Sequence, residues 1–153
     1  MGTKKQIAII GGGTHSWIGS HLSLSAPGYG TTARIIETLC KQLIPEMDTR
    51  LYLTKMAGGK ELETNEDISK LVDQIVTDDV TKVVFFTAAM VDFSVGFPMG
   101  EYMDMSKYGT RLSSKHRYHL MLNPAEKVIN KIRKNRKDIF LVGFKQTCGL
   151  TED

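Results

Sequence analysis

The sequence has few of the features that mark several classes of protein. Its two cysteines, Cys40 and Cys148, are too few for a disulfide framework and suit a reducing compartment. No apolar run is long enough to span a bilayer, and the N-terminus lacks the apolar core of a signal peptide. The net charge of +3 is too small to indicate nucleic-acid binding. We therefore expect a cytoplasmic protein that binds neither membranes nor nucleic acid.

The chain also lacks internal repeats, low-complexity tracts and linkers. Its 153 residues, with 41% hydrophobic and 24% charged side chains, are typical of one globular domain with a sizeable core. We expect a single Rossmann-like nucleotide-binding domain over residues 1–153.

The central stretch is Lys82–Phe86, a β-branched and aromatic run typical of a strand that is buried on both faces. Before it, a strand at Gln6–Ile10, a helical pattern over 31–44, a strand at 51–53 and a helix capped by Thr64 or Asn65 follow in order. A last strand is expected at 138–142. This alternation predicts an α/β fold, a Rossmann-like three-layer sandwich with a mainly parallel sheet.

The first helix has one apolar stripe, formed by Ile35, Ile36, Leu39, Cys40 and Leu43. Cys40 is therefore expected in the core. Catalytic chemistry at Cys148 is disfavoured because no histidine lies near it in the sequence.

Two segments lack regular periodicity. His15–Gly30 is expected to be a long loop over the ligand edge of the sheet. Residues 93–117 are expected to form a protruding arm, in which Met99, Met103 and Met105 give either a contact surface for a partner or a disordered lid. After the arm we expect a strand at Tyr118–Leu122 and a helix that starts at Asn123-Pro124.

Small or polar residues follow the strands of the predicted sheet. Gly11, Gly12 and Gly13 follow the first strand, Thr87–Asp92 follows the central one, and Gly143-Phe144 ends the last. The carboxyl ends of parallel strands meet at one edge, where open α/β sheets bind ligands. Such a set suits a nucleoside phosphate: amides for the phosphate, Asp92 for a ribose hydroxyl or a metal ion, Phe144 for a base or sugar. The glycines also suit a simple tight turn, and Asp92 a turn cap.

A nicotinamide-dependent oxidoreductase is disfavoured. Ser16 stands where the third glycine of the dinucleotide fingerprint belongs, and Thr54-Lys55 leaves no acid after the second strand to hold a ribose.

Four motifs in order resemble phosphopantothenoylcysteine synthetase (phosphopantothenate–cysteine ligase). They are Ile-Ile-Gly-Gly-Gly-Thr near the N-terminus, Thr87–Asp92, Leu122-Asn123-Pro124, and Leu141–Phe144 with Thr147. The resemblance covers nearly the whole chain. It implies a cytoplasmic enzyme of coenzyme A biosynthesis, usually a homodimer. Such a ligase uses CTP or ATP with Mg²⁺ to activate the carboxylate of 4′-phosphopantothenate as an acyl-nucleotidylate, from which the amine of cysteine displaces the nucleotide.

The resemblance also implies roles for individual residues. Arg111 falls near the first lysine of the family's Lys-Ile-Lys-Lys, so that Arg111 and Asp92 are the expected catalytic residues. The expected nucleotide-binding residues are Gly11, Gly12, Gly13, Phe86, Thr87, Ala88, Asp92, Pro124, Ala125, Glu126, Lys127 and Phe144. No separate metal site on the protein is expected.

Some positions depart from the family pattern. Ala26 stands near the asparagine of the family's Ser-Asn-x-Ser-Ser-Gly, and Ser113 and Ser114 replace later lysines. The family's lysine-bearing loop over the triphosphate has no counterpart. Missing cations would weaken phosphate binding and transition-state stabilisation. The alternative is therefore a non-catalytic nucleotide-binding or regulatory module.

Overall fold

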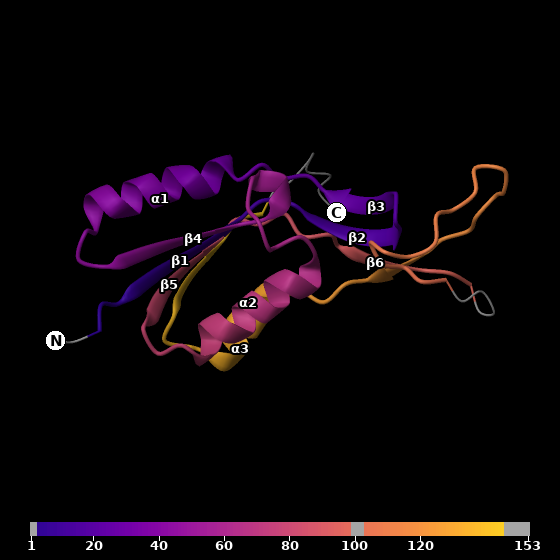
Figure 1. Cartoon of the computed structure of the whole chain (residues 1–153). Helices are drawn as coiled ribbons and strands as arrows, with labels where there is room; N and C mark the ends of the chain where they lie inside the picture. The colour runs from indigo at the N-terminus through magenta and orange to yellow at the C-terminus, as the bar shows by residue number, and fades with distance from the viewer. Residues whose placement is uncertain (1–2, 99–102, 146–153) are drawn as a thin grey trace, which may run out of the picture.

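A computed structural model describes residues 3–98 and 103–145. Its centre is a four-stranded sheet in the order β4-β1-β5-β8, and each neighbouring pair is parallel (Figure 1). The strands are β1 (Gln6–Gly11), β4 (Asp48–Leu53), β5 (Thr81–Phe86) and β8 (Phe140–Gly143). Every residue of β1 is buried, as expected of a strand covered on both faces.

Helices cover both faces of this sheet. They are α1 (Thr31–Leu43), α2 (Asn65–Thr77) and α3 (Ile129–Asn135). Figure 1 shows α1 on one side, with α2 and α3 on the other. Because side chains alternate along a strand, Ile7 and Ile9 of β1 pack toward α1, while Ala8 and Ile10 pack with the apolar residues of α2 and α3. The predicted three-layer Rossmann-like class is confirmed.

The sequence predicted a cap at Thr64 or Asn65, and the structure has it at Thr64, as part of a capping box. The hydroxyl of Thr64 accepts a hydrogen bond from the amide of Asp67, and the Asp67 carboxylate accepts from the amide of Thr64. Burial raises the pKa of Asp67, but the backbone donors of Thr64 and Glu63 outweigh it and lower that pKa. Because the cap fixes the first turn of α2, it also fixes the position of Asn65, the first residue of that helix.

The predicted stripe of α1 is only partly in the core. Cys40 and Ala33 are buried, and burial raises the pKa of the Cys40 thiol. Ile35, Leu39 and Leu43 are instead exposed. The reason is that α1 packs mainly on β1 and β4, so the apolar arc of the helix is wider than the surface it covers.

The predicted loop at His15–Gly30 is wrong. This segment forms an antiparallel ribbon of β2 (Thr14–Gly19) and β3 (Leu22–Ala26). Its strands are short and rich in Ser and Gly, which gives weak strand propensity, and their stability comes from pairing with each other and from contact with α2 and the arm.

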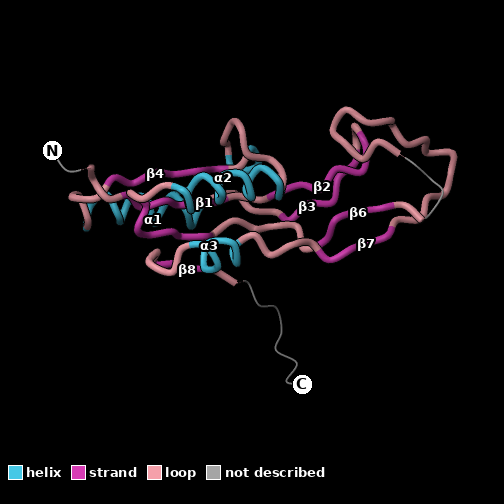
Figure 2. The backbone as a smooth tube through the Cα atoms, turned by 90° about the horizontal axis from the view of Figure 1, so that it is seen from below, coloured by secondary structure: helices cyan, strands magenta, loops and turns pink. Residues whose placement is uncertain are grey.

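The predicted arm protrudes from the same end of the sheet (Figures 1 and 2). It is built on β6 (Phe93–Gly96), which pairs antiparallel with β7 (Met121–Pro124) and lies against β2. The helix expected at Asn123-Pro124 is wrong, because Pro124 pairs with Phe93 and α3 begins only at Ile129. For the same reason the strand expected at Tyr118–Leu122 is displaced toward the C-terminus. Met99 lies outside the described residues, as does Cys148.

A 3-10 turn, η1 (Lys55–Ala57), follows β4. Within the described ranges, each helix is too short or too polar to cross a bilayer.

Candidate functional site

The carboxyl ends of β1, β5 and β8 lie side by side. The amide of Thr87 donates to the carbonyl of Ile10 at 2.8 Å, and the amide of Phe144 donates to the carbonyl of Phe86 at 3.3 Å. The Phe144 ring is about half exposed. The structure therefore brings Gly11, Thr87 and Phe144 to one edge of the sheet.

Gly11, the last residue of β1, and Gly12 and Gly13, which follow it, are buried under this edge. The amide of Gly13 donates to the carbonyl of Gly28 at 2.8 Å, and the carbonyl of Gly12 accepts from Ala89 at 2.9 Å. A Cβ on Gly12 would lie 2.1 Å from Oγ1 of Thr54, and one on Gly13 would lie 2.1 Å from the carbonyl oxygen of Ala26. The glycines thus let neighbouring backbones approach closely. Their role toward phosphate stays a prediction.

Asp92 lies at the open side of the edge, after the half-buried Ala88. Its carbonyl accepts from the amide of Ala125 at 2.8 Å, and its carboxylate forms an ion pair with the ammonium group of Lys127. The side chain of Asp92 is 63% exposed and that of Lys127 is 62% exposed. Both charges are therefore accessible to a ligand.

A small hollow of about 50 Å³ lies beside this ion pair. Its lining includes Phe86, Asp92, Ala125, Glu126 and Lys127, which come from β5, the loop after it and the segment before α3. The structure therefore brings together residues that the sequence placed far apart and that the resemblance assigned to one site.

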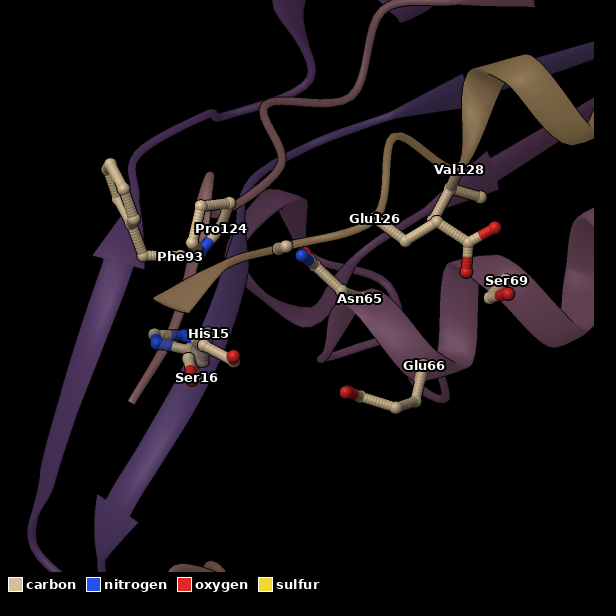
Figure 3. A pocket seen from close by; sticks show the side chains of 11 residues that line it. His15, Ser16, Asn65, Glu66, Ser69, Phe93, Pro124, Glu126 and Val128 are labelled. Atoms are coloured by element: carbon tan, nitrogen blue, oxygen red, sulfur yellow. The ribbon is translucent and has the colours of Figure 1, made fainter. Parts of the chain in front are cut away.

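A larger hollow of about 280 Å³ lies on the α2 side of Pro124–Glu126. Figure 3 shows His15 and Ser16 of β2 on one side, Asn65 and Glu66 of α2 on another, and the side chain of Glu126 directed toward Ser69. Its volume lies just below the range of about 300–1,000 Å³ typical of small-molecule sites. It therefore extends the predicted site toward α2.

The sequence did not single out most of this lining. The additional residues are His15, Ser16, Asn65, Glu66, Ser69, Phe93, Ser94 and Val128. The sequence did hold a signal for Asn65 and Glu66, because a helix predicted to start at Thr64 or Asn65 follows a strand of the parallel sheet. The others depend on how β2 and β6 fold back.

The arm closes a neighbouring hollow of about 540 Å³, which shares His15, Ser16, Glu66 and Ser94 with the previous one. The ammonium group of Lys107 donates to both carboxylate oxygens of Glu63 at 3.1 Å and lies 5.7 Å from the ring centre of Trp17. Lys55 also donates to Glu63 at 2.9 Å. Burial raises the pKa of Glu63, but the two lysines outweigh it and lower that pKa.

Arg111 is placed elsewhere on the arm. It is exposed, between Thr110, whose carbonyl lies against Gly19, and the buried Leu112. It lines none of the hollows described above. The structure therefore does not bring Arg111 to Asp92, and its catalytic role stays a prediction.

In the described ranges, no group of three or more His, Cys, Asp or Glu side chains is placed to hold a metal ion. Mg²⁺ commonly binds through one or two carboxylates together with substrate phosphates and water. Asp92 offers one exposed carboxylate of this kind, and its use by a metal ion stays a prediction.

Comparison with known proteins bears on the fold and on the resemblance. No protein-family model matches the chain. The coenzyme A biosynthesis bifunctional protein CoaBC of Thermococcus kodakarensis is 29% identical over 93 residues, which are 61% of this chain and 21% of that protein. The chain thus spans about a fifth of this curated relative.

Two solved structures share the fold. The DNA/pantothenate metabolism flavoprotein from Streptococcus pneumoniae matches with a TM-score of 0.72 and 21% identity, over 92% of this chain and 69% of that one. The C-terminal domain of CoaBC matches with a TM-score of 0.60 and 16% identity, over 90% and 62%. The predicted resemblance is confirmed. This chain has the fold of the pantothenate-metabolism proteins.

Proposed function

We propose that the protein is a phosphopantothenate–cysteine ligase-like enzyme that binds CTP or ATP. The observation that carries the proposal is the convergence of Phe86, Asp92 and Ala125–Lys127 around one hollow at the carboxyl edge of the sheet. The similarity to CoaBC gives the reaction class.

The proposed reaction has two steps. A carboxylate oxygen of 4′-phosphopantothenate attacks the α-phosphorus of the nucleotide, and the bond to pyrophosphate breaks. The amine of cysteine then attacks the acyl carbon, loses a proton, and displaces the nucleoside monophosphate to leave an amide.

The residues at the edge have distinct tasks in this proposal. Asp92 holds a ribose hydroxyl or the Mg²⁺ ion that accompanies the phosphates, and Lys127 neutralises phosphate charge. The exposed ring of Phe144 packs against the base or the sugar.

A second candidate is a nucleotide-binding module without ligase activity. The observation that favours it concerns Ala26, which stands near the asparagine of the family pattern but has no amide side chain. The carbonyl of Ala26 packs against Gly13. Such a module would bind the nucleotide and release no pyrophosphate.

A homodimer is also proposed. The arm has exposed apolar side chains at Phe93, Leu120, Met121 and Leu122, and a two-stranded ribbon of this kind is marginally stable alone. Sedimentation of the wild type and of Leu122→Glu tests this: a dimer that the substitution dissociates supports the proposal, and a monomeric wild type contradicts it.

Pyrophosphate release tests the enzyme. The wild type, with Mg²⁺, 4′-phosphopantothenate and either CTP or ATP, is expected to release pyrophosphate, and Asp92→Ala is expected to lose most of this activity. Release should depend on 4′-phosphopantothenate. Nucleotide binding without release favours the module, and the absence of both rejects the two candidates together.

A further inference from the structure

The main chain of Val91 is held on both sides by two side chains from distant parts of the sequence. Its amide donates to Oγ1 of Thr14 at 3.0 Å, and its carbonyl accepts from Nδ2 of Asn65 at 2.8 Å. The hydroxyl of Thr14 in turn donates to Oδ1 of Asn65 at 2.7 Å. The three residues form a closed ring of hydrogen bonds.

This ring is shielded from water. Thr14 is fully buried and Val91 nearly so, while Asn65 is half-buried. Each donor in the ring has an acceptor, so removal of the Thr14 hydroxyl leaves a buried amide of Val91 and an oxygen of Asn65 unpaired. A buried polar group without a partner is costly, and the chain relieves that cost by moving.

The segment that would move is the one that presents Asp92. The ring fixes the residue immediately before Asp92, and the carbonyl of Asp92 orients the amide of Ala125, two residues before Lys127. The backbone bonds of Thr14 to Ala89 and of Ala89 to Gly12 hold the earlier part of the loop. The hydrogen bonds from Thr14 and Asn65 therefore hold the main chain at Val91, the residue directly before Asp92.

We propose that Thr14 and Asn65 are positioning residues that set the place of Asp92 and, through Ala125, of Lys127. The proposal rests on the proposed function, since Asp92 and Lys127 are the groups that face the nucleotide in it. Thr14, which is fully buried, acts without touching the nucleotide, and Asn65 also lines the hollow of about 280 Å³. Displacement of a catalytic group by about 1 Å can lower a rate by about a hundredfold.

The chain offers a matched control for a purely structural effect. Thr54 is as fully buried as Thr14, yet its hydroxyl has no hydrogen-bond partner among the residues that the structure describes. Thr54→Val and Thr14→Val therefore make the same change of shape and polarity at two buried sites, and only the second breaks the ring. At α2 the helix cap is Thr64, so Asn65→Asp removes the donor to Val91 and leaves the cap in place.

The experiment combines amide hydrogen exchange by NMR with the kinetics of pyrophosphate release on the full chain. In Thr14→Val we expect the Val91 amide to exchange at least about tenfold faster while amides of β1 and β5 keep their protection, and kcat to fall about ten- to hundredfold. Thr14→Ser should restore both, and Thr54→Val should change neither. Asn65→Asp should lower kcat as Thr14→Val does.

The outcomes separate the two proposals. Wild-type kcat or unchanged Val91 exchange in Thr14→Val overturns the positioning role, whether or not the protein is a ligase. If Thr14→Val does not fold, Asn65→Asp and Thr14→Ser decide, and wild-type kcat in Asn65→Asp overturns the inference. A wild type that binds no nucleotide overturns the proposed function first, and the positioning of a nucleotide site falls with it even if the exchange result stands.

Discussion

The ammonium group of Lys127 is paired with the carboxylate of Asp92, which lies 35 positions earlier in the chain. The pair joins the loop after β5 to the segment before α3, and both side chains are largely exposed. An exposed ion pair contributes only about 0–1 kcal/mol to stability. The pair therefore contributes little to the fold, and a role toward a ligand can be tested separately from stability.

Substitution of this pair should separate binding from stability. Asp92→Asn and Lys127→Met are each expected to change the free energy of unfolding by less than about 1 kcal/mol and to weaken nucleotide binding at least about tenfold. Urea denaturation and calorimetric titration measure the two effects. Lys82→Met, which breaks the exposed pair with Asp138, is the control and should leave affinity unchanged. Equal affinities for all three variants would contradict a role for the Asp92–Lys127 pair.

The glycines under the edge should be intolerant of a methyl group. Gly12 has a φ of 106°, and its Cβ would meet Thr54, so Gly12→Ala is expected to cost about 3 kcal/mol or more. Gly96→Ala is the control, because among the described residues its Cβ would meet only the flexible side chain of Asn123, at 3.3 Å. Urea denaturation should find the control within about 1 kcal/mol of the wild type. A stable Gly12→Ala would show that the packing at β1 is looser than described.

Acid should break the contact between Glu63 and Lys107 of the arm. The folded-state pKa of Glu63 is lowered, so its contacts with Lys107 and Lys55 contribute stability above its unfolded pKa of about 4.3 and are lost as pH falls below that value. Trp17 is the single tryptophan of the chain and lies beneath Lys107, so its fluorescence reports on this contact. We expect a fluorescence change below about pH 4. Glu63→Gln should lack it, and an identical titration of that variant would contradict the assignment.

The coverage of α1 can be tested with two isoleucines. Ile68 of α2 is fully buried, so Ile68→Ala is expected to lower the free energy of unfolding by about 2–5 kcal/mol. Ile35 of α1 is more than half exposed, and Ile35→Ala should change the free energy of unfolding by less than about 0.5 kcal/mol. Chemical denaturation of both variants decides. A large loss at Ile35 would mean that its side of α1 is covered in solution.

Local patterns predicted the parts of the fold that depend on local physics. The buried run at Lys82–Phe86, the order of strands and helices, and the cap at Thr64 all follow from periodicity and hydrogen-bonding chemistry near in sequence. Thr87 and Phe144 lie close together because each follows one of two neighbouring parallel strands, β5 and β8. The topology alone predicts this, without information about side chains.

The remaining features depend on contacts between distant segments. The ribbon at Thr14–Ala26 has weak strand propensity and forms by pairing, and Pro124 belongs to β7 because Phe93 lies opposite it. The lining of the hollow of about 280 Å³ by His15 and Ser94 follows from these two ribbons. Arg111 was matched by its position in a motif, and it is not among the residues that line the hollow beside Asp92.

The most direct test of nucleotide binding at this edge is calorimetric titration of the wild type with CTP and with ATP in the presence of Mg²⁺. We expect saturable binding of at least one of them, at least about tenfold weaker in Asp92→Ala while urea denaturation shows both proteins equally folded. Folded protein that gives no heat of binding with either nucleotide, or equal affinities for the wild type and Asp92→Ala, would contradict the account.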